Sequence, residues 1–197
     1  MDLKIILGAI AVILAFISSA IYIQDIFKGN TKPHVYTWLI WSIVTWIAFG
    51  GQFVSGGGPG AWATGASAFL TTFILFLSLK GNYGTKDITN FDKICLFLAL
   101  VSILPWLLVD SILWSVILAS LIDVIGFFPT MRKTWSNPKS ESLKSMWVDF
   151  VKHSLSIMSM RNYSLITWLY PAAVLLTKII IITEIIYLRK FKNKVIL

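Results

Sequence analysis

The sequence predicts an all-α integral membrane protein with seven transmembrane helices, arranged as two parallel three-helix repeats joined by a linker helix. Three observations predict this fold: an apolar composition, seven long apolar runs, and an approximate repeat along the chain. Of the 197 residues, 57% are hydrophobic and only 13% are charged, with a mean hydropathy of +0.79. A soluble domain of this size carries about a quarter charged residues. Helices this apolar must be covered by lipid or by one another, so the lipid bilayer is the first expected partner.

Residues that cannot continue a helix separate the apolar runs, for example the glycine-rich segment 56–60 and the segment 80–84. A membrane span needs about 20 residues, so seven spans use most of the chain. Each run is expected to be helical, because backbone polar groups in hydrocarbon must be satisfied within the segment. The runs are 5–23, 35–54, 61–79, 94–109, 111–128, 143–160 and 164–188.

The sixth and seventh runs carry ionisable residues. Asp149, Lys152 and His153 interrupt the sixth run, which is therefore the weakest of the seven, while Lys178 and Glu184 lie in the seventh. Ionisable groups at bilayer depth are costly and usually face a cavity or a partner. The sixth and seventh helices are therefore expected to turn these side chains toward the interior.

The first run has two features of a signal peptide: Lys4 precedes it, and the small residues Ser18-Ser19-Ala20 lie near its end. Its length and the following segment 25–32, which has the composition of a cytoplasmic loop, favour a retained first helix. With the N-terminus outside and the C-terminus cytoplasmic, 13 of the 17 Lys and Arg residues fall on the inner side. Cytoplasmic loops carry such an excess of positive charge, so this topology is predicted.

A shift of 109 residues superimposes the first three runs on the last three. Under this shift Trp38 meets Trp147 and Ser55 meets Ser164, and the span boundaries align without gaps. Both triplets then have the same orientation, which is a parallel repeat about an axis along the membrane normal. The predicted units are a first bundle (1–80), a linker with the fourth helix (81–110), a second bundle (111–190) and a basic cytoplasmic tail (191–197).

A local motif connects this architecture with a known family. The segment Gly126-Phe127-Phe128-Pro129-Thr130-Met131-Arg132-Lys133, followed by Trp135, Pro138 and Glu141-Ser142, resembles the second PQ loop of the PQ-loop superfamily, with Thr130 in the usual place of Gln. The seven-helix arrangement resembles that of the SWEET sugar transporters of this superfamily, and the first loop resembles small bacterial membrane proteins of it. The resemblance implies solute translocation and location in a bacterial inner membrane. Spans two and six lack the prolines, and spans three and seven the asparagines, typical of SWEETs, so sugar is not implied.

The candidate residues for substrate binding or coupling are polar or aromatic and lie in the spans. Asp149 is spaced to approach both Lys152 and His153 on one helix face, as a solute-binding or proton-coupling cluster or as a structural salt bridge. If spans five and six are neighbours, Asp123 pairs with Lys152 or His153; a structural hydrogen-bonding role is the alternative. The full set is Asp123, Asp149, Lys152, His153, Trp38 and Trp147.

Trp38 and Trp147 occupy equivalent repeat positions, where they form either a symmetric gate or part of an interfacial aromatic belt. Pro129 and Pro171 remove backbone donors, which makes them candidate hinges for the movement of one triplet against the other. The alternatives are a helix terminus at Pro129, which the nearby Arg132-Lys133 pair favours, and a static kink at Pro171.

Several functions are excluded or disfavoured by what the sequence lacks. It has no Gly-Lys-Ser or Gly-Lys-Thr phosphate loop, and its two His and one Cys give no zinc pattern. The net charge of +8 sits mostly in loops, where it sets topology, so no nucleic acid partner is expected. No enzymatic activity, cofactor or metal is expected. The sequence favours a transporter for a small polar solute, such as a sugar or an amino-acid-like molecule, that works by alternating access with or without proton coupling. A non-transporting receptor or accessory protein is the alternative, and the oligomeric state stays open between monomer and homo-oligomer.

Overall fold

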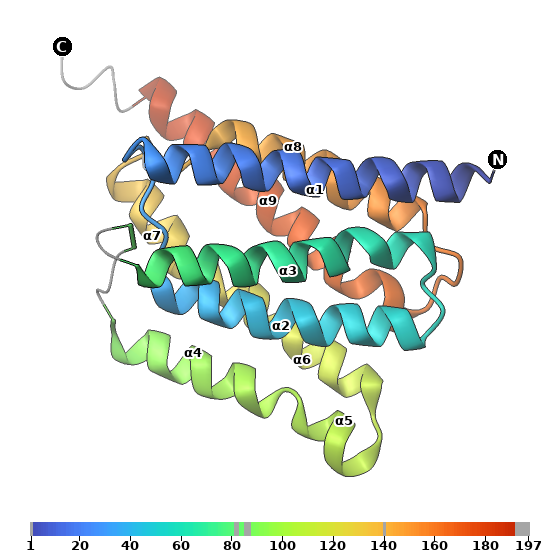
Figure 1. The fold of residues 1–197 in the computed structure, drawn as a ribbon. Coiled ribbons are helices and arrows are strands. Elements are labelled where there is room, and N and C mark those ends of the chain that lie inside the picture. Colours follow the sequence, from blue (N-terminus) through green and yellow to red (C-terminus); the bar gives the residue numbers. More distant parts are fainter. Residues whose placement is uncertain (1, 81–82, 85–87, 140, 192–197) are drawn as a thin grey trace.

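The protein is a bundle of helices packed side by side (Figure 1). A computed structural model describes residues 2–80, 83–84, 88–139 and 141–191. The basic tail from 192 onward and Lys86 lie outside the described residues. Within the described residues the helices are α1 (Leu3–Phe27), α2 (Val35–Val54), α3 (Pro59–Leu79), α4 (Asn90–Val101), α5 (Leu104–Val109), α6 (Ile112–Gly126), α7 (Phe128–Ser136), α8 (Leu143–Met158) and α9 (Leu165–Phe191).

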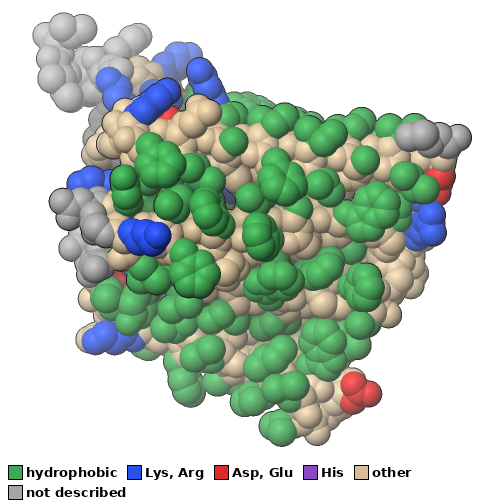
Figure 2. All heavy atoms as spheres, viewed as in Figure 1, with side chains coloured by type: hydrophobic (Ala, Val, Ile, Leu, Met, Phe, Trp, Pro, Cys, Tyr) green, Lys and Arg blue, Asp and Glu red, His purple; other side chains and the backbone are tan. Residues whose placement is uncertain are grey.

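Six helical stretches among the described residues are long and apolar enough to cross a membrane: α1, α2, α3, the α4–α5 stretch, the α6–α7 stretch and α9. Their outer surface is covered with hydrophobic side chains (Figure 2). The protein therefore has the helices of an integral membrane protein, as the composition predicts. The predicted sixth span, α8, is not among the six: it is 16 residues long and carries ionisable residues.

The helices pack in a closed order. α3 packs against both α1 and α2, and α9 packs against both α6 and α8. Contacts between α1 and α8 and between α2 and α6 join these two sets. α4 lies outside, against α2 and α6 (Figure 1). We call α1, α2 and α3 the first triplet and α6, α8 and α9 the second triplet.

Two predicted spans are interrupted. The fourth is broken at Ser102–Ile103 into α4 and α5, because Pro105 lacks the backbone N–H that a continuous helix needs, and α5 starts just before it. The fifth ends at Gly126, close to Pro129, so Pro129 stands at a helix terminus. After a break at Phe127 the chain turns into α7, with Pro129 in the first turn, where proline is tolerated.

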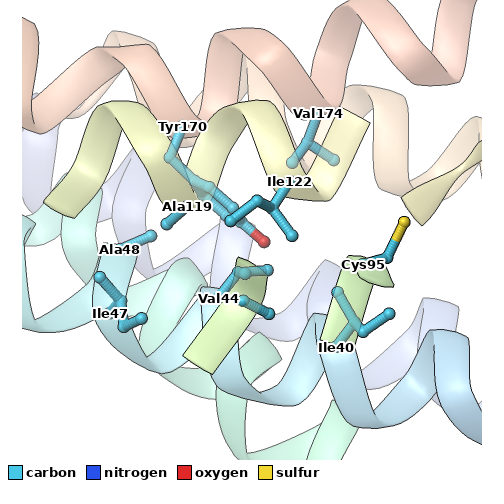
Figure 3. Packing of buried hydrophobic residues seen from close by; sticks show 10 residues of the cluster. Ile40, Val44, Ile47, Ala48, Cys95, Ala119, Ile122, Tyr170 and Val174 are labelled. Atoms are coloured by element: carbon cyan, nitrogen blue, oxygen red, sulfur yellow. The ribbon is translucent and has the colours of Figure 1, made fainter. Parts of the chain in front are cut away.

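The largest apolar core lies where the two triplets meet α4. Ile40, Val44, Ala119 and Tyr170 belong to this cluster, together with Cys95 from α4 (Figure 3). Tyr170 reaches from α9 between α2 and α6, so the cluster connects four helices. This core packs α4 against the side of the bundle, leaving the interior between the triplets to other residues.

The two ends of the bundle differ in charge and in packing. One end, which we call the basic end, holds the α1–α2 loop, the α7–α8 segment and the last turn of α9. Lys and Arg side chains gather there (Figure 2). The other end, which we call the closed end, holds the start of α1, the α2–α3 turn and the α8–α9 turn (Figure 1).

Candidate functional site

A cavity of about 1100 Å³ enters the bundle from the basic end. Its outer lining consists of exposed residues from the α1–α2 loop and the α7–α8 segment, among them Lys32 and Lys139. Its inner lining includes Ser67 of α3, Lys152 of α8 and Lys178 of α9. The cavity therefore lies between the two triplets and reaches side chains deep in the helices.

At its inner end the cavity meets a carboxylate held between two ammonium groups. Asp149 Oδ1 lies 2.9 Å from Lys152 Nζ, and its Oδ2 lies 3.0 Å from Lys178 Nζ. Lys152 also donates to Ser67 Oγ at 3.0 Å. The three side chains are 6–18% exposed, so water screens this cluster far less than it screens a surface ion pair.

Local geometry explains the cluster. Asp149 and Lys152 are three residues apart on α8, a spacing that places them on one helix face. Lys178 comes from α9, which packs along α8, and its ammonium lies 5.2 Å from the ring centre of Phe127. The cation–π contact and the ion pair hold the Lys178 ammonium at the cavity wall.

Hydroxyl groups line the side of the cavity between α1 and α8. Ser18 and Ser145 face each other with their Oγ atoms 2.9 Å apart, and each also donates to the other's backbone carbonyl, at 3.2 and 3.1 Å. Both serines line the cavity. Both hydroxyls already have hydrogen-bond partners, and because they line the cavity they can also form hydrogen bonds with a polar solute.

Aromatic rings form the wall on the side of α2. The ring centre of Trp38 lies 5.1 Å from that of Tyr22 and 5.3 Å from that of Trp41, and the Trp41 ring centre lies 4.7 Å from that of Phe127. The Trp38–Trp41 contact is edge-on, and the other two ring pairs are tilted. All four rings line the cavity. Trp147, which the predicted repeat aligns with Trp38, is 47% exposed on α8 and packs on Phe150. It is not among the residues that line the cavity.

Asp123 lies behind the cavity wall rather than on it. Tyr170 donates to Asp123 Oδ1 at 3.2 Å, and the same hydroxyl lies 2.8 Å from Thr45 Oγ1. The sequence predicts a pairing of Asp123 with Lys152 or His153 if the fifth and sixth spans are neighbours. Instead α9 packs between α6 and α8, so Tyr170 of α9 is the partner.

His153 is buried on α8, one residue after Lys152, and does not line the cavity. Among the residues that the structure describes, no ion pair joins it to Asp149, and its Nδ1 has no hydrogen-bond partner. Of the two approaches expected for Asp149, the structure forms the one to Lys152.

The two proline positions differ. Pro129 stands just after the break between α6 and α7, next to Thr130, which lines the cavity. Pro171 is buried inside α9, which continues through it. No hinge movement follows from these positions alone.

Two residues of the cluster are absent from the candidate set that the sequence indicates: Lys178 and Ser67. A lysine in an otherwise apolar span was a usable signal for Lys178, because such charges usually face a cavity or a partner. Ser67 carried no comparable signal, since small residues on α3 also suit close helix packing.

Comparisons with protein-family models, with curated proteins and with solved structures find no match for this chain. Among the described residues no group of three or more His, Cys, Asp or Glu side chains is placed to hold a metal ion. The chemistry of the site therefore rests on its own residues: two ammonium groups, one carboxylate, hydroxyls and indole rings.

Proposed function

We propose that the protein is a membrane transporter that moves a small polar solute by alternating access. One observation carries the proposal: a polar cavity enters from the basic end, reaches the Asp149–Lys152–Lys178 cluster deep between the triplets, and faces a packed closed end. A pathway that is open on one side and sealed on the other is what a transporter needs in one of its two states.

The closed end supports this proposal through direct contacts between triplets. The Arg161 backbone N–H donates to Gly57 O at 3.1 Å, and Asn162 Nδ2 donates to Ser55 O at 3.0 Å. Ser156 Oγ donates to Gly60 O at 2.7 Å, so the end of α8 also seats on the start of α3. Lys4 Nζ also donates to Met160 O at 2.6 Å, so the two triplets are joined at the closed end by hydrogen bonds that an outward-open state would have to break.

The packing order supports a repeat. A two-fold axis between the triplets would exchange α1 with α6, α2 with α8, and α3 with α9. Each contact then has a counterpart: α1 with α8 matches α6 with α2, and α3 with α8 matches α9 with α2. This agrees with the 109-residue shift and with the PQ-loop resemblance. We propose two parallel three-helix repeats, with α4 and α5 as the linker.

The charge distribution supports an orientation. Lys and Arg side chains gather at the basic end (Figure 2), where the cavity opens, and positive charge marks the cytoplasmic side of a membrane protein. We propose that the N-terminus and the closed end face outward, in a bacterial inner membrane, and that the structure is the inward-open state.

The test is solute counterflow in proteoliposomes with a disulfide that locks the closed end. A Cβ on Gly56 would lie 3.9 Å from the Asn162 Cβ, within the range of natural disulfides. In a Cys95→Ala background, Gly56→Cys with Asn162→Cys should stop solute exchange when oxidised and regain it on reduction. Each single cysteine variant is the control, because Gly56 has a φ of 74° and a side chain there brings strain of its own.

Unimpaired exchange in protein shown to be crosslinked would contradict alternation at this end. A receptor or accessory protein remains the second candidate, since the same cavity can hold a ligand without flux. Solute binding without counterflow, in protein that stays folded, would favour that candidate.

A further inference from the structure

The cavity lining carries an excess of positive charge. Among the residues that the structure describes, seven Lys and Arg side chains line it, against three Asp and Glu side chains. The cationic residues are Lys32, Arg132, Lys139, Lys144, Lys152, Lys178 and Arg189, and the anionic ones are Asp25, Glu141 and Asp149. Those at the mouth face water and set topology, so the charges at the inner end are the informative ones.

At the inner end two ammonium groups share one carboxylate. Both Asp149 oxygens are occupied, Oδ1 by Lys152 and Oδ2 by Lys178. Asp123 does not line the cavity, because it lies behind α9 with Tyr170 as its donor. The surface that a solute meets therefore carries one positive charge more than it carries negative charge. The other carboxylate of this region, Asp123, stands behind the wall, so an anion in the cavity would meet the two ammonium groups directly and be attracted by them.

We propose that the solute is a small organic anion whose carboxylate contacts Lys152 and Lys178 from the cavity, while Asp149 holds the two ammonium groups in place. Ser67 and the Ser18–Ser145 pair supply hydroxyls to the rest of the anion. This inference rests on the proposed function and names the substrate class of that same site.

Other classes of solute fit the inner end less well. A cationic solute would meet two ammonium groups at the inner end, and the one carboxylate that lines it, Asp149, already pairs with both of them. A neutral solute such as a sugar would leave the excess positive charge without a counter-ion. Only an anion adds favourable electrostatics to the hydrogen bonds that all three classes can make.

Equilibrium binding and counterflow on the same preparation test the inference. The anionic probes are radiolabelled acetate, lactate and succinate; glucose is the neutral probe and putrescine the cationic one. Vesicles of phosphatidylcholine keep anionic lipid headgroups away from the site. We expect binding of at least one carboxylate, and no binding of glucose or putrescine.

Lys152→Gln and Lys178→Gln should each weaken carboxylate binding about tenfold or more, because each removes one of two buried partners of the anion. Each variant leaves a neutral ion pair with Asp149, so the fold should be retained. Lys93→Gln is the matched control. It removes the same charge from an exposed position on α4 outside the cavity, and binding should not change.

The possible outcomes separate the anion inference from the transporter proposal. Exchange of glucose or putrescine without carboxylates would overturn the anion inference and leave the transporter proposal standing. Carboxylate binding without counterflow would support the inference and overturn transport. Binding equal in Lys152→Gln, Lys178→Gln and Lys93→Gln would overturn the assigned site. No binding and no exchange of any probe by folded protein would overturn both proposals.

Discussion

The two triplets pack their helices in the same order but differ sharply in chemistry. In the first triplet α2 and α3 contain no charged residue, and the charges of α1 lie near its ends, at Lys4 and Asp25. In the second triplet, Asp149, Lys152 and Lys178 stand in the middle of α8 and α9, and Asp123 lies in the last turn of α6. The first triplet therefore brings the indole rings of Trp38 and Trp41 to the cavity, and the second brings the buried charges of its inner end.

The difference extends to how each triplet packs. Close approaches in the first triplet depend on glycine. A Cβ on Gly8 would come within 2.7 Å of Pro59 O, and one on Gly65 within 2.7 Å of the Phe49 ring. Small residues of this kind let helix backbones meet in lipid, where the hydrophobic effect does not drive association. Between the triplets, polar contacts such as the Lys152–Ser67 hydrogen bond add to the apolar packing of α2 against α6.

The largest expected effect comes from removing the carboxylate of the second triplet. Asp149→Ala leaves two buried ammonium groups without their counter-ion, and we expect a loss of about 3–5 kcal/mol of stability. Thermal unfolding of the purified protein in detergent measures it. Ser67→Ala removes the hydroxyl partner of the same cluster from the first triplet and should cost only about 1 kcal/mol. Equal losses would show that the charged and hydroxyl sides contribute alike.

Trp38 and Trp147, which the 109-residue shift aligns, test whether aligned positions in the two triplets contribute equally to stability. Trp38 is 8% exposed and packed between Tyr22 and Trp41, so Trp38→Ala should lower stability by about 3 kcal/mol. Trp147 lies on the outer surface, where lipid fills the space left by Trp147→Ala, so we expect a loss below about 1 kcal/mol. Similar unfolding temperatures for the two variants would contradict this difference.

The smallest expected effect concerns the glycines. Gly8→Ala should destabilise by about 1–3 kcal/mol, because its new methyl group would meet the Pro59 backbone. Gly126→Ala in α6 is the control from the second triplet, since the nearest atom to its Cβ is 3.4 Å away. There the better helix propensity of alanine should leave stability unchanged or raise it by up to about 1 kcal/mol. Unfolding in a denaturant series measures both variants. A loss of stability in Gly126→Ala as large as that in Gly8→Ala would contradict the difference expected between the two triplets.

Much of the helix pattern could be predicted from sequence because hydrophobic length is a local property. The run 35–54 coincides with α2, and 143–160 contains α8. The differences came near prolines. The fourth run is predicted as one span, yet the helix breaks at Ser102–Ile103, ahead of Pro105. The sequence favours a helix terminus at Pro129, but it does not predict the further helix α7, which begins there. Whether proline ends or starts a helix depends on which backbone groups its neighbours can satisfy, and periodicity does not report this.

The candidate site could be predicted only where its residues are close in sequence. Asp149 and Lys152 are three residues apart, and their contact follows from helix geometry. The second ammonium group on Asp149 comes from Lys178, one helix later, and the hydroxyl partner comes from Ser67 in the other triplet. Asp123 received Tyr170 as its partner because α9 lies between α6 and α8.

The sequence by itself determined the all-helical class, the apolar helices long enough to cross a membrane and the gathering of positive charge at one end, because each depends on residue types counted along a short stretch of chain. Only the tertiary structure decided whether Trp38 or Trp147 lines the cavity, which lysine completes the cluster, and which aspartate stands behind the wall. Those choices depend on the rotation of each helix about its axis and on its neighbours, which are set by the packing of the whole bundle.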